Sequence, residues 1–279
     1  MGLQRPGSRR VCTNSGGTHD LVSRPPQYVN AAGHDFHLQP TSPVIDQGTN
    51  VGLPFNGSAP DMGAFESGGP VAWYKLDETS GTAALDSSGN GNNSSFVQGT
   101  SIVPGKINNA RSFNARTTSD YINIPTSPSL SGLNQFTVAF WIKTTNRSLN
   151  STAQTALFDK GDYQISGVQI LDDGPYSGLV VCRTNYAGGS NDVSIPRISI
   201  NDDAWHHLAC TFDGVTKTFY LDGNALSTGG VSGYVSPDNY ALHLGTPWNN
   251  ASSAVVIEDD VRIYNRALSV TEIQALVNP

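Results

Sequence analysis

The chain has 279 residues, of which 14% are charged, and it carries a formal net charge of −7 together with 29 Gly and 16 Pro. Nucleic acid is disfavoured as a partner, because binding to phosphates needs a positive surface that this acidic chain has few Lys and Arg to build. Membrane insertion is not expected either, because no apolar run approaches the roughly 20 residues that span a bilayer.

The first 69 residues show no sustained periodicity and end in Glu66-Ser-Gly-Gly, which with Pro70 is typical of a linker. We therefore place a domain boundary between residues 1–69 and 70–279. The stretches 35–48 and 59–66 resemble the last coil and closing segment of right-handed parallel β-helix proteins of the pectate-lyase-like group. A single coil cannot bury its apolar face alone, so the resemblance implies a truncated β-helix end. A disordered leader is the alternative.

The basic start of the chain is not followed by the apolar segment of a secretory signal. The chain is therefore either intracellular or a piece of a longer exported protein whose signal peptide lies upstream. We favour the exported piece, since the first 69 residues resemble a truncated end.

From Val71 onward, apolar and polar residues alternate with period two, which predicts strands. Asp222-Gly223 marks a hairpin turn between two of them. One short helix is expected over residues 267–276, because Ser269 and Glu272 form a capping box. The expected strands cover residues 71–77, 121–125, 136–143, 205–212, 218–224, 241–245 and 255–264.

Three cysteines are too few and too irregularly spaced for a disulfide framework or a zinc site. Cys182 and Cys210 lie in apparent strands, and we expect two buried thiols, with a disulfide between strands as the alternative. The tryptophans within strands, Trp73, Trp141 and Trp205, are expected in the core. Many strands without interleaved helices predict an all-β fold, either a sandwich or a jelly roll.

Seven segments in order carry a resemblance that spans residues 70–279. Among them are Trp73-Tyr-Lys-Leu-Asp-Glu-Thr-Ser-Gly81, Trp205-His-His-Leu-Ala209 and Asp259-Asp-Val-Arg-Ile-Tyr-Asn-Arg-Ala-Leu-Ser269. They are similar to the bacterial laminin-G-like/concanavalin A-like domain, which also resembles pentraxins. The resemblance implies a jelly-roll sandwich of two antiparallel sheets, preceded by an irregular N-terminal segment and followed by one short helix.

Calcium is the expected cofactor. Asp86 and Asn90 lie in the glycine-rich loop Asp86-Ser-Ser-Gly-Asn-Gly91, which offers carboxylate, amide and carbonyl oxygens. The resemblance implies a second acidic ligand from the final strand, which falls on Asp259. Asp77 and Asp260 are weaker candidates, and the alternative for the loop is an Asx turn that bonds to itself.

A glycan is the expected partner, because jelly rolls commonly bind sugars with an aromatic ring flanked by amides and carboxylates. Trp248 and Asn249 lie in a polar loop outside the strand pattern, and Tyr163 and Tyr186 occupy other loop-like stretches. Packing of Trp248 inside the fold is the alternative.

Catalytic carboxylates are not evident. Retaining glycoside hydrolases of this fold usually carry a Glu-x-Asp-x-x-Glu strand, and none of the four Glu begins that pattern. We predict a monomeric, non-catalytic carbohydrate-binding or adhesion module of a larger secreted bacterial protein, stabilised by calcium. The alternatives are a protein-binding structural domain and a glycan-active enzyme, a glycoside hydrolase or polysaccharide lyase with atypical residues.

Overall fold

The computed structural model describes residues 25–30, 35–39, 41–49, 61–62, 68–113, 120–145, 155–162, 166–172, 178–234, 236, 239–245 and 256–278. The chain divides into two compact units, Met1–Gly69 and Pro70–Pro279. In the described part of the first unit, β1 (Tyr28–Asn30) pairs with β2 (Asp35–Leu38) in antiparallel orientation. The resemblance of this unit to the end of a β-helix stays a prediction.

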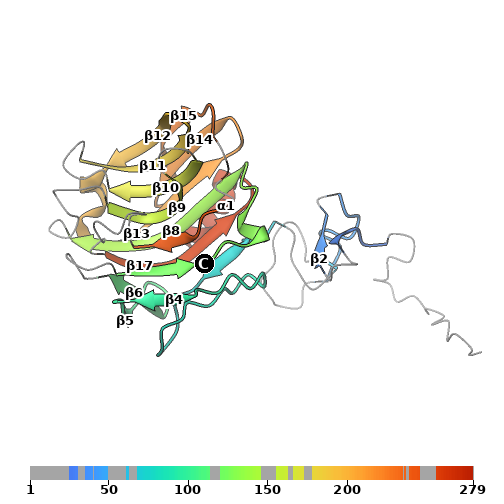
Figure 1. Ribbon diagram of the computed structural model, residues 1–279, viewed down its shortest axis with the longest axis horizontal. Coiled ribbons are helices and arrows are strands. Elements are labelled where there is room, and N and C mark those ends of the chain that lie inside the picture. The colour runs from blue at the N-terminus through green and yellow to red at the C-terminus, as the bar shows by residue number, and fades with distance from the viewer. Residues whose placement is uncertain are drawn as a thin grey trace, which may run out of the picture. The chain divides into compact units, whose positions relative to one another are not determined.

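The second unit is an all-β sandwich of two antiparallel sheets, which confirms the predicted fold class. Figure 1 shows β9 to β12 of one sheet side by side in sequence order. That seven-stranded sheet has the order β12 (Gly189–Pro196), β11 (Leu179–Tyr186), β10 (Ser166–Asp172), β9 (Thr155–Asp162), β16 (Leu242–Leu244), β7 (Tyr121–Ile124) and β4 (Phe96–Gln98).

The other sheet has eight strands. Seven follow the order β15 (Asn224–Gly230), β14 (Thr216–Leu221), β13 (Asp202–Phe212), β8 (Phe136–Thr145), β17 (Val256–Tyr264), β6 (Asn109–Phe113) and β5 (Ser101–Pro104). The eighth, β3 (Ala72–Tyr74), pairs with β17. Two short 3-10 helices, Pro128–Leu130 and Arg197–Ile200, precede β8 and β13.

The hydrophobic core lies between the sheets and follows the predicted alternation. On β8, Phe136, Val138, Phe140 and Ile142 are buried in it, while the residues between them leave the sheet on the other side. On each strand, every second residue faces the core in the same way. The residues between them form the outer face of each sheet.

Helix α1 (Val270–Val277) covers part of the outer face of the eight-stranded sheet. Its capping box is present, because the Ser269 hydroxyl accepts from the Glu272 amide at 3.3 Å and the Glu272 carboxylate accepts from the Ser269 amide at 2.8 Å. A second apolar cluster joins helix to sheet and contains Ala139, Ala209, Tyr220, Tyr264, Leu268, Ile273 and Leu276.

The expectation of two buried thiols is wrong, because Cys182 and Cys210 form a disulfide. Cys182 lies on β11 and Cys210 on β13, in different sheets, so the bond crosses the core. Alternation along each strand shows that both side chains face inward. It does not show that the two positions lie opposite each other, with Cα atoms 6.4 Å apart.

The tryptophans also differ from the expectation of core positions. Trp141 is buried but belongs to the outer side of β8, where its ring meets His207 edge-on at 5.2 Å. Trp73 and Trp205 are partly exposed. Lys75 and Arg262 each stack on the Trp73 ring at 4.5 Å, so its apolar surface is covered by cationic side chains instead of the core.

Candidate functional site

Six neighbouring strands of the seven-stranded sheet each contribute one polar side chain to a continuous row. The Cα positions are paired strand to strand from β7 to β12. At least one chain neighbour of each residue belongs to the core, so the six side chains lie on the outer face of the sheet. This polar row consists of Asn123, His243, Asp159, Gln169, Arg183 and Asp192.

The centre of the polar row is buried and held by amide groups. The Gln169 amide nitrogen donates to Asp159 Oδ1 at 3.0 Å, and the Asn185 amide nitrogen donates to Gln169 Oε1 at 3.2 Å. Asn185 is the next outward residue after Arg183 on β11, and its Oδ1 is buried without a hydrogen-bond partner. Leaving such an acceptor unpaired costs about 1–3 kcal/mol.

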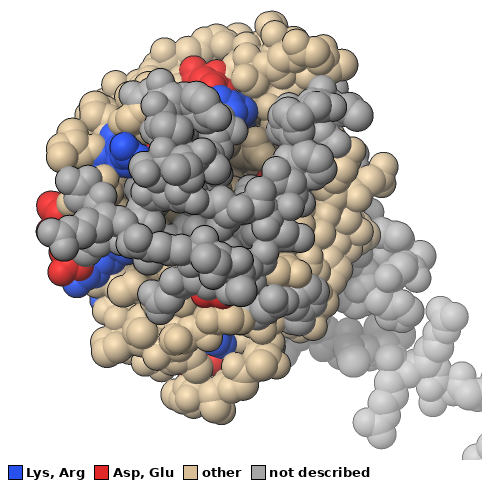
Figure 2. Space-filling model, turned by 60° about the vertical axis from the view of Figure 1, so that its left-hand side comes forward, with Lys and Arg blue, Asp and Glu red and all other residues tan. Residues whose placement is uncertain are grey.

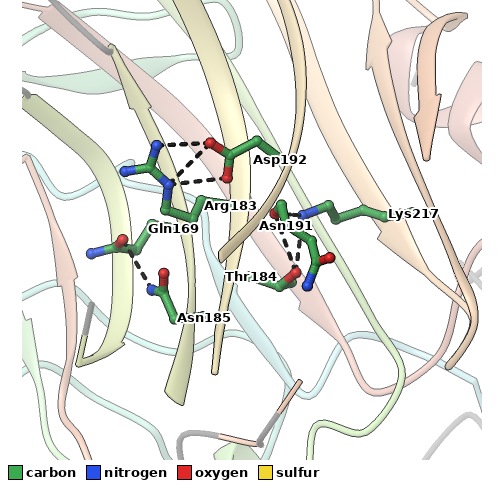
Figure 3. Close-up of polar contacts among 7 residues, drawn as sticks. All are labelled: Gln169, Arg183, Thr184, Asn185, Asn191, Asp192 and Lys217. Atoms are coloured by element: carbon green, nitrogen blue, oxygen red, sulfur yellow. Dashed lines mark hydrogen bonds and ion pairs between the residues drawn. The ribbon is translucent and has the colours of Figure 1, made fainter. Parts of the chain in front are cut away.

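Both ends of the polar row are more exposed than its centre. At the β12 end, Arg183 grips Asp192 with two nitrogens, Nε to Oδ1 at 3.0 Å and Nη2 to Oδ2 at 2.7 Å (Figure 3). Towards β7, burial lowers the pKa of His243, so its neutral ring offers one donor and one acceptor. The Tyr121 ring meets that imidazole edge-on at 5.9 Å.

Lys217 of β14 supports the row from the core side. Its Nζ is buried and donates to Thr184 Oγ1 at 3.0 Å and to the Asn191 carbonyl at 2.5 Å. Figure 3 shows these contacts on the other side of the strands from Gln169 and Asn185. Burial lowers the pKa of Lys217 to about 7, with Asp192 opposing the shift.

The visible surface has no broad charged patch. Figure 2 shows acidic and basic side chains in small separate groups on the face that it draws. The described residues of that face form no long positive stripe of the kind that nucleic-acid binding requires.

Three of the predicted sugar-binding residues, Trp248, Asn249 and Tyr163, lie outside the described residues. Tyr186 is described and ends β11 at partial exposure. Its ring lies close against two glycines, since a Cβ on Gly189 would come within 2.6 Å of the hydroxyl and one on Gly233 within 3.2 Å of Cγ. Tyr186 therefore stands beside the polar row and is not part of it.

The predicted calcium loop forms hydrogen bonds within itself and to the segment around β3. Asp86 accepts bonds from the amides of Trp73, Ser88 and Asn92 and from the Ser88 hydroxyl. The Asn90 amide donates to the Val71 carbonyl at 3.0 Å. This is the geometry of the Asx-turn alternative, and metal binding by these two residues stays a prediction.

Asp259 lies beside a different loop, which the sequence did not link to it. Its Oδ2 accepts from the Ile107 amide at 2.8 Å, whereas Oδ1 is buried without a partner. Burial raises the pKa of this carboxyl to about 7, and nearby Asp260 and Asp77 act in the same direction. Within the described ranges, no group of three or more His, Cys, Asp or Glu is arranged to hold a metal ion.

Comparison with known proteins decides the family. The profile described as the concanavalin A-like lectin/glucanases superfamily (Laminin_G_3) matches residues 116–274, which is more than half of the chain. The chain belongs to this family. No curated protein matches this concanavalin A-like chain significantly in sequence. Among the residues that the structure describes, no helix has both the length and the apolarity needed to cross a membrane.

Solved structures share the concanavalin A-like fold at low identity. The binding domain of Paraclostridial Mosquitocidal Protein 1 is 21% identical, with a TM-score of 0.59, and the match covers 75% of this chain and 52% of that one. Domain 4 of AbnA, an extracellular arabinanase from Geobacillus stearothermophilus in complex with arabinotriose, is 21% identical with a TM-score of 0.58, over 75% and 98% of the two chains.

The binding domain of botulinum neurotoxin DC in complex with SialylT is 15% identical with a TM-score of 0.58, over 75% of this chain and 51% of that one. The chain thus spans about half the length of the toxin binding domains that it matches. At these identities the likeness shows the fold alone.

Proposed function

We propose that this chain is a non-catalytic carbohydrate-binding module whose ligand lies along the polar row. The observation that carries the proposal is the alignment of six polar side chains, one per strand, with a buried amide oxygen of Asn185 left unpaired beside them. Sugar hydroxyls both donate and accept hydrogen bonds, and a row of amide, imidazole and carboxylate groups offers both.

The comparisons support a glycan as the ligand class. The family is named for lectins and glucanases, and two relatives of the same fold are in complex with arabinotriose and with SialylT. The polar row supports binding in particular, because its carboxylate at Asp159 is occupied by Gln169 in a structural hydrogen bond.

We propose that the protein acts outside the cell. The Cys182–Cys210 disulfide supports this location, because such bonds persist in oxidising compartments and are rare in the cytosol. The arabinanase whose domain 4 shares this fold is likewise an extracellular protein.

We also propose one structural calcium ion, with Asp259 as the residue whose geometry fits it best. The buried, unpaired Oδ1 of Asp259 is an oxygen ligand of the kind that calcium prefers, and the Asp77 carboxylate is close enough to raise the Asp259 pKa. Asp86 already accepts four hydrogen bonds and is a poorer ligand. Bound calcium would stabilise the fold by mass action.

Calcium is tested by melting the full chain in EDTA and in calcium chloride. At 100 times the dissociation constant, binding adds about 2.7 kcal/mol, which corresponds to roughly 5 to 10 °C in melting temperature for a domain of this size. Asp259→Asn should abolish the difference, while the exposed control Asp203→Asn should keep it. Equal melting temperatures with and without calcium, together with no metal in the purified protein, would refute the proposal.

Carbohydrate binding is tested on a glycan array, followed by calorimetry with the best hit. Asn123→Ala removes a partly exposed amide from the polar row, and losing one hydrogen bond worth about 0.5–1.5 kcal/mol predicts roughly 2- to 13-fold weaker binding. Gln169→Met should weaken it further, because it breaks both central amide contacts.

Thr218→Val is the matched control, since Thr218 lies on an outer-facing position of the other sheet and bonds to the exposed Thr228. Its affinity should equal that of the wild type. The proposal is contradicted if no glycan on the array binds, or if the Asn123→Ala variant binds as tightly as the wild type. Sugar products released from a hit would instead favour an enzyme.

A further inference from the structure

A hollow at one end of the sandwich is lined by residues that are not part of the polar row. It is formed where β8 begins, where β13 ends and where the chain leaves β15, all in the eight-stranded sheet. Its volume is ≈390 Å³, which is within the usual range of small-ligand sites. The lining residues are Asn134, Gln135, Phe212, Gly214, Val231, Gly233 and Tyr234.

Aromatic rings form the apolar part of the hollow. Phe212 and Tyr234 meet edge-on with centroids 5.3 Å apart, and Phe136 lies 5.5 Å from the first and 5.9 Å from the second. The Tyr234 hydroxyl donates to the Leu133 carbonyl at 3.1 Å, so this ring is fixed at both its edge and its hydroxyl. Phe136 and Phe212 are buried in the core, so the partly exposed Tyr234 is the ring of these three that a ligand can contact. Because its neighbours hold this ring in place, less entropy is lost on binding.

Two exposed amides form the rim. The Gln135 nitrogen donates to the Asp213 carbonyl at 2.7 Å, which orients the side chain and leaves its oxygen as an acceptor. Asn134, the preceding residue, adds a second amide with donors and an acceptor. Gly214 adds no side chain to the lining, and a Cβ there would stand 3.7 Å from the Gln135 nitrogen, at ordinary van der Waals distance.

None of the lining residues that the structure describes carries a charge, although 14% of the chain is charged. A charged ligand would therefore lose its hydration with no ion pair in return. A neutral sugar fits both parts of the hollow, because its C–H face can pack on the Tyr234 ring while its hydroxyls bond to the two amides. Tyr186, which packs against Gly233, extends the aromatic border.

We infer that this hollow is a second carbohydrate site, which takes one end of a neutral sugar chain. The inference rests on the proposed function for its ligand class, but a different set of residues builds the site. Two separated sites on one domain would let the protein engage a polysaccharide at two points, and so raise its apparent affinity through a high effective concentration.

The test is a titration of the isotope-labelled full chain with neutral methyl glycosides, followed by heteronuclear NMR. The probes are methyl β-D-glucopyranoside, methyl β-D-galactopyranoside and methyl α-L-arabinofuranoside. The backbone amides of Gly214 and Gly233 report on the hollow, and the side-chain amides of Gln169 and Asn185 report on the polar row. A saturable shift of both glycine amides with at least one probe is the expected result.

The double variant Asn134→Ala/Gln135→Ala should weaken that binding at least fivefold, while Asn224→Ala, an exposed amide at the start of β15, should not change it. Unmoved glycine amides, or shifts that the double variant leaves intact, overturn the second site. Shifts confined to Gln169 and Asn185 overturn the second site and leave the polar row standing. Shifts confined to the glycines support the second site and count against the polar row.

Discussion

Replacing Lys217 with methionine removes a buried amine from between the sheets while it keeps a flexible side chain of similar length. The lysine Nζ donates to Thr184 Oγ1 and to the Asn191 carbonyl, and it is fully buried. Burial lowers its pKa from 10.5 to about 7. A neutral amine has two hydrogens for these two acceptors, so its hydrogen bonds do not require the charge.

The lowered pKa fixes the sign of the pH dependence. The unfolded chain keeps the Lys217 proton up to about pH 10.5, whereas the folded protein releases it near pH 7. Between these values the unfolded state binds more protons, so this group makes the folded state more stable as the pH rises. The gain approaches about 1.4 kcal/mol per pH unit once the pH exceeds the folded pKa, and amounts to about 2.3 kcal/mol from pH 7 to pH 9.

The contribution of Lys217 to the free energy of unfolding is measured by guanidinium unfolding of the wild type and Lys217→Met. Unfolding is followed by tryptophan fluorescence at pH 7, 8 and 9. The free energy of unfolding of the wild type minus that of the variant should rise across the series. Lys143→Met is the control, because this partly exposed lysine pairs with the exposed Asp203 and keeps its contact with water. A wild-type advantage that is the same at all three pH values would refute the lowered pKa.

Three further changes have defined outcomes. Reducing the Cys182–Cys210 bond opens a loop with a sequence separation of 28, which should cost about 3–4 kcal/mol of unfolding free energy in denaturant titrations. Ser269→Ala removes the helix cap and should cost about 1 kcal/mol, seen as earlier amide exchange in α1. Burial opposes the charged form of His206, but hydrogen bonds to Asp222 and Asp202 outweigh it and raise the pKa. The advantage of the wild type over His206→Gln should be full below pH 6.5 and vanish as the pH rises through the folded pKa, and an advantage that persists at high pH would contradict this.

The strands that alternate strongly could be predicted from the sequence, and others could not. Residues 136–143 and 205–212 fall within β8 and β13, and the predicted hairpin at Asp222-Gly223 joins β14 to β15. Strand β11 is indicated only by the apolar residues around Cys182, and β9, β10 and β12 were not predicted, because they contain Gly, Ser, Asn and Asp, which also mark turns.

The polar row could not be predicted from the sequence, for a related reason. Its members come from strands far apart in the chain, and only the register of sheet pairing places His243 beside Asp159. The sugar-binding residues were expected instead among aromatic residues in loops. Of those, Tyr186 is described and lies beside the hollow formed by Gly233 and its neighbours. The signal that could have indicated Gln169 is a polar amide between the apolar residues Val168 and Ile170, in a segment without aromatic residues.

One disulfide and several hydrogen bonds join the two sheets near the strands that carry one half of the polar row. The disulfide ties β11 to β13, and Lys217 ties β14 to β11 and β12. At the sheet edges, the Asn191 amide donates to the Ser232 carbonyl at 2.9 Å. Edge strands otherwise fray and pair with other chains, and these ties restrain both. Because donors that are fixed before binding lose less entropy, reduction of the disulfide should weaken glycan binding even where the domain stays folded. A reduced, folded protein with unchanged affinity would show that the row keeps its register without the cross-sheet bond.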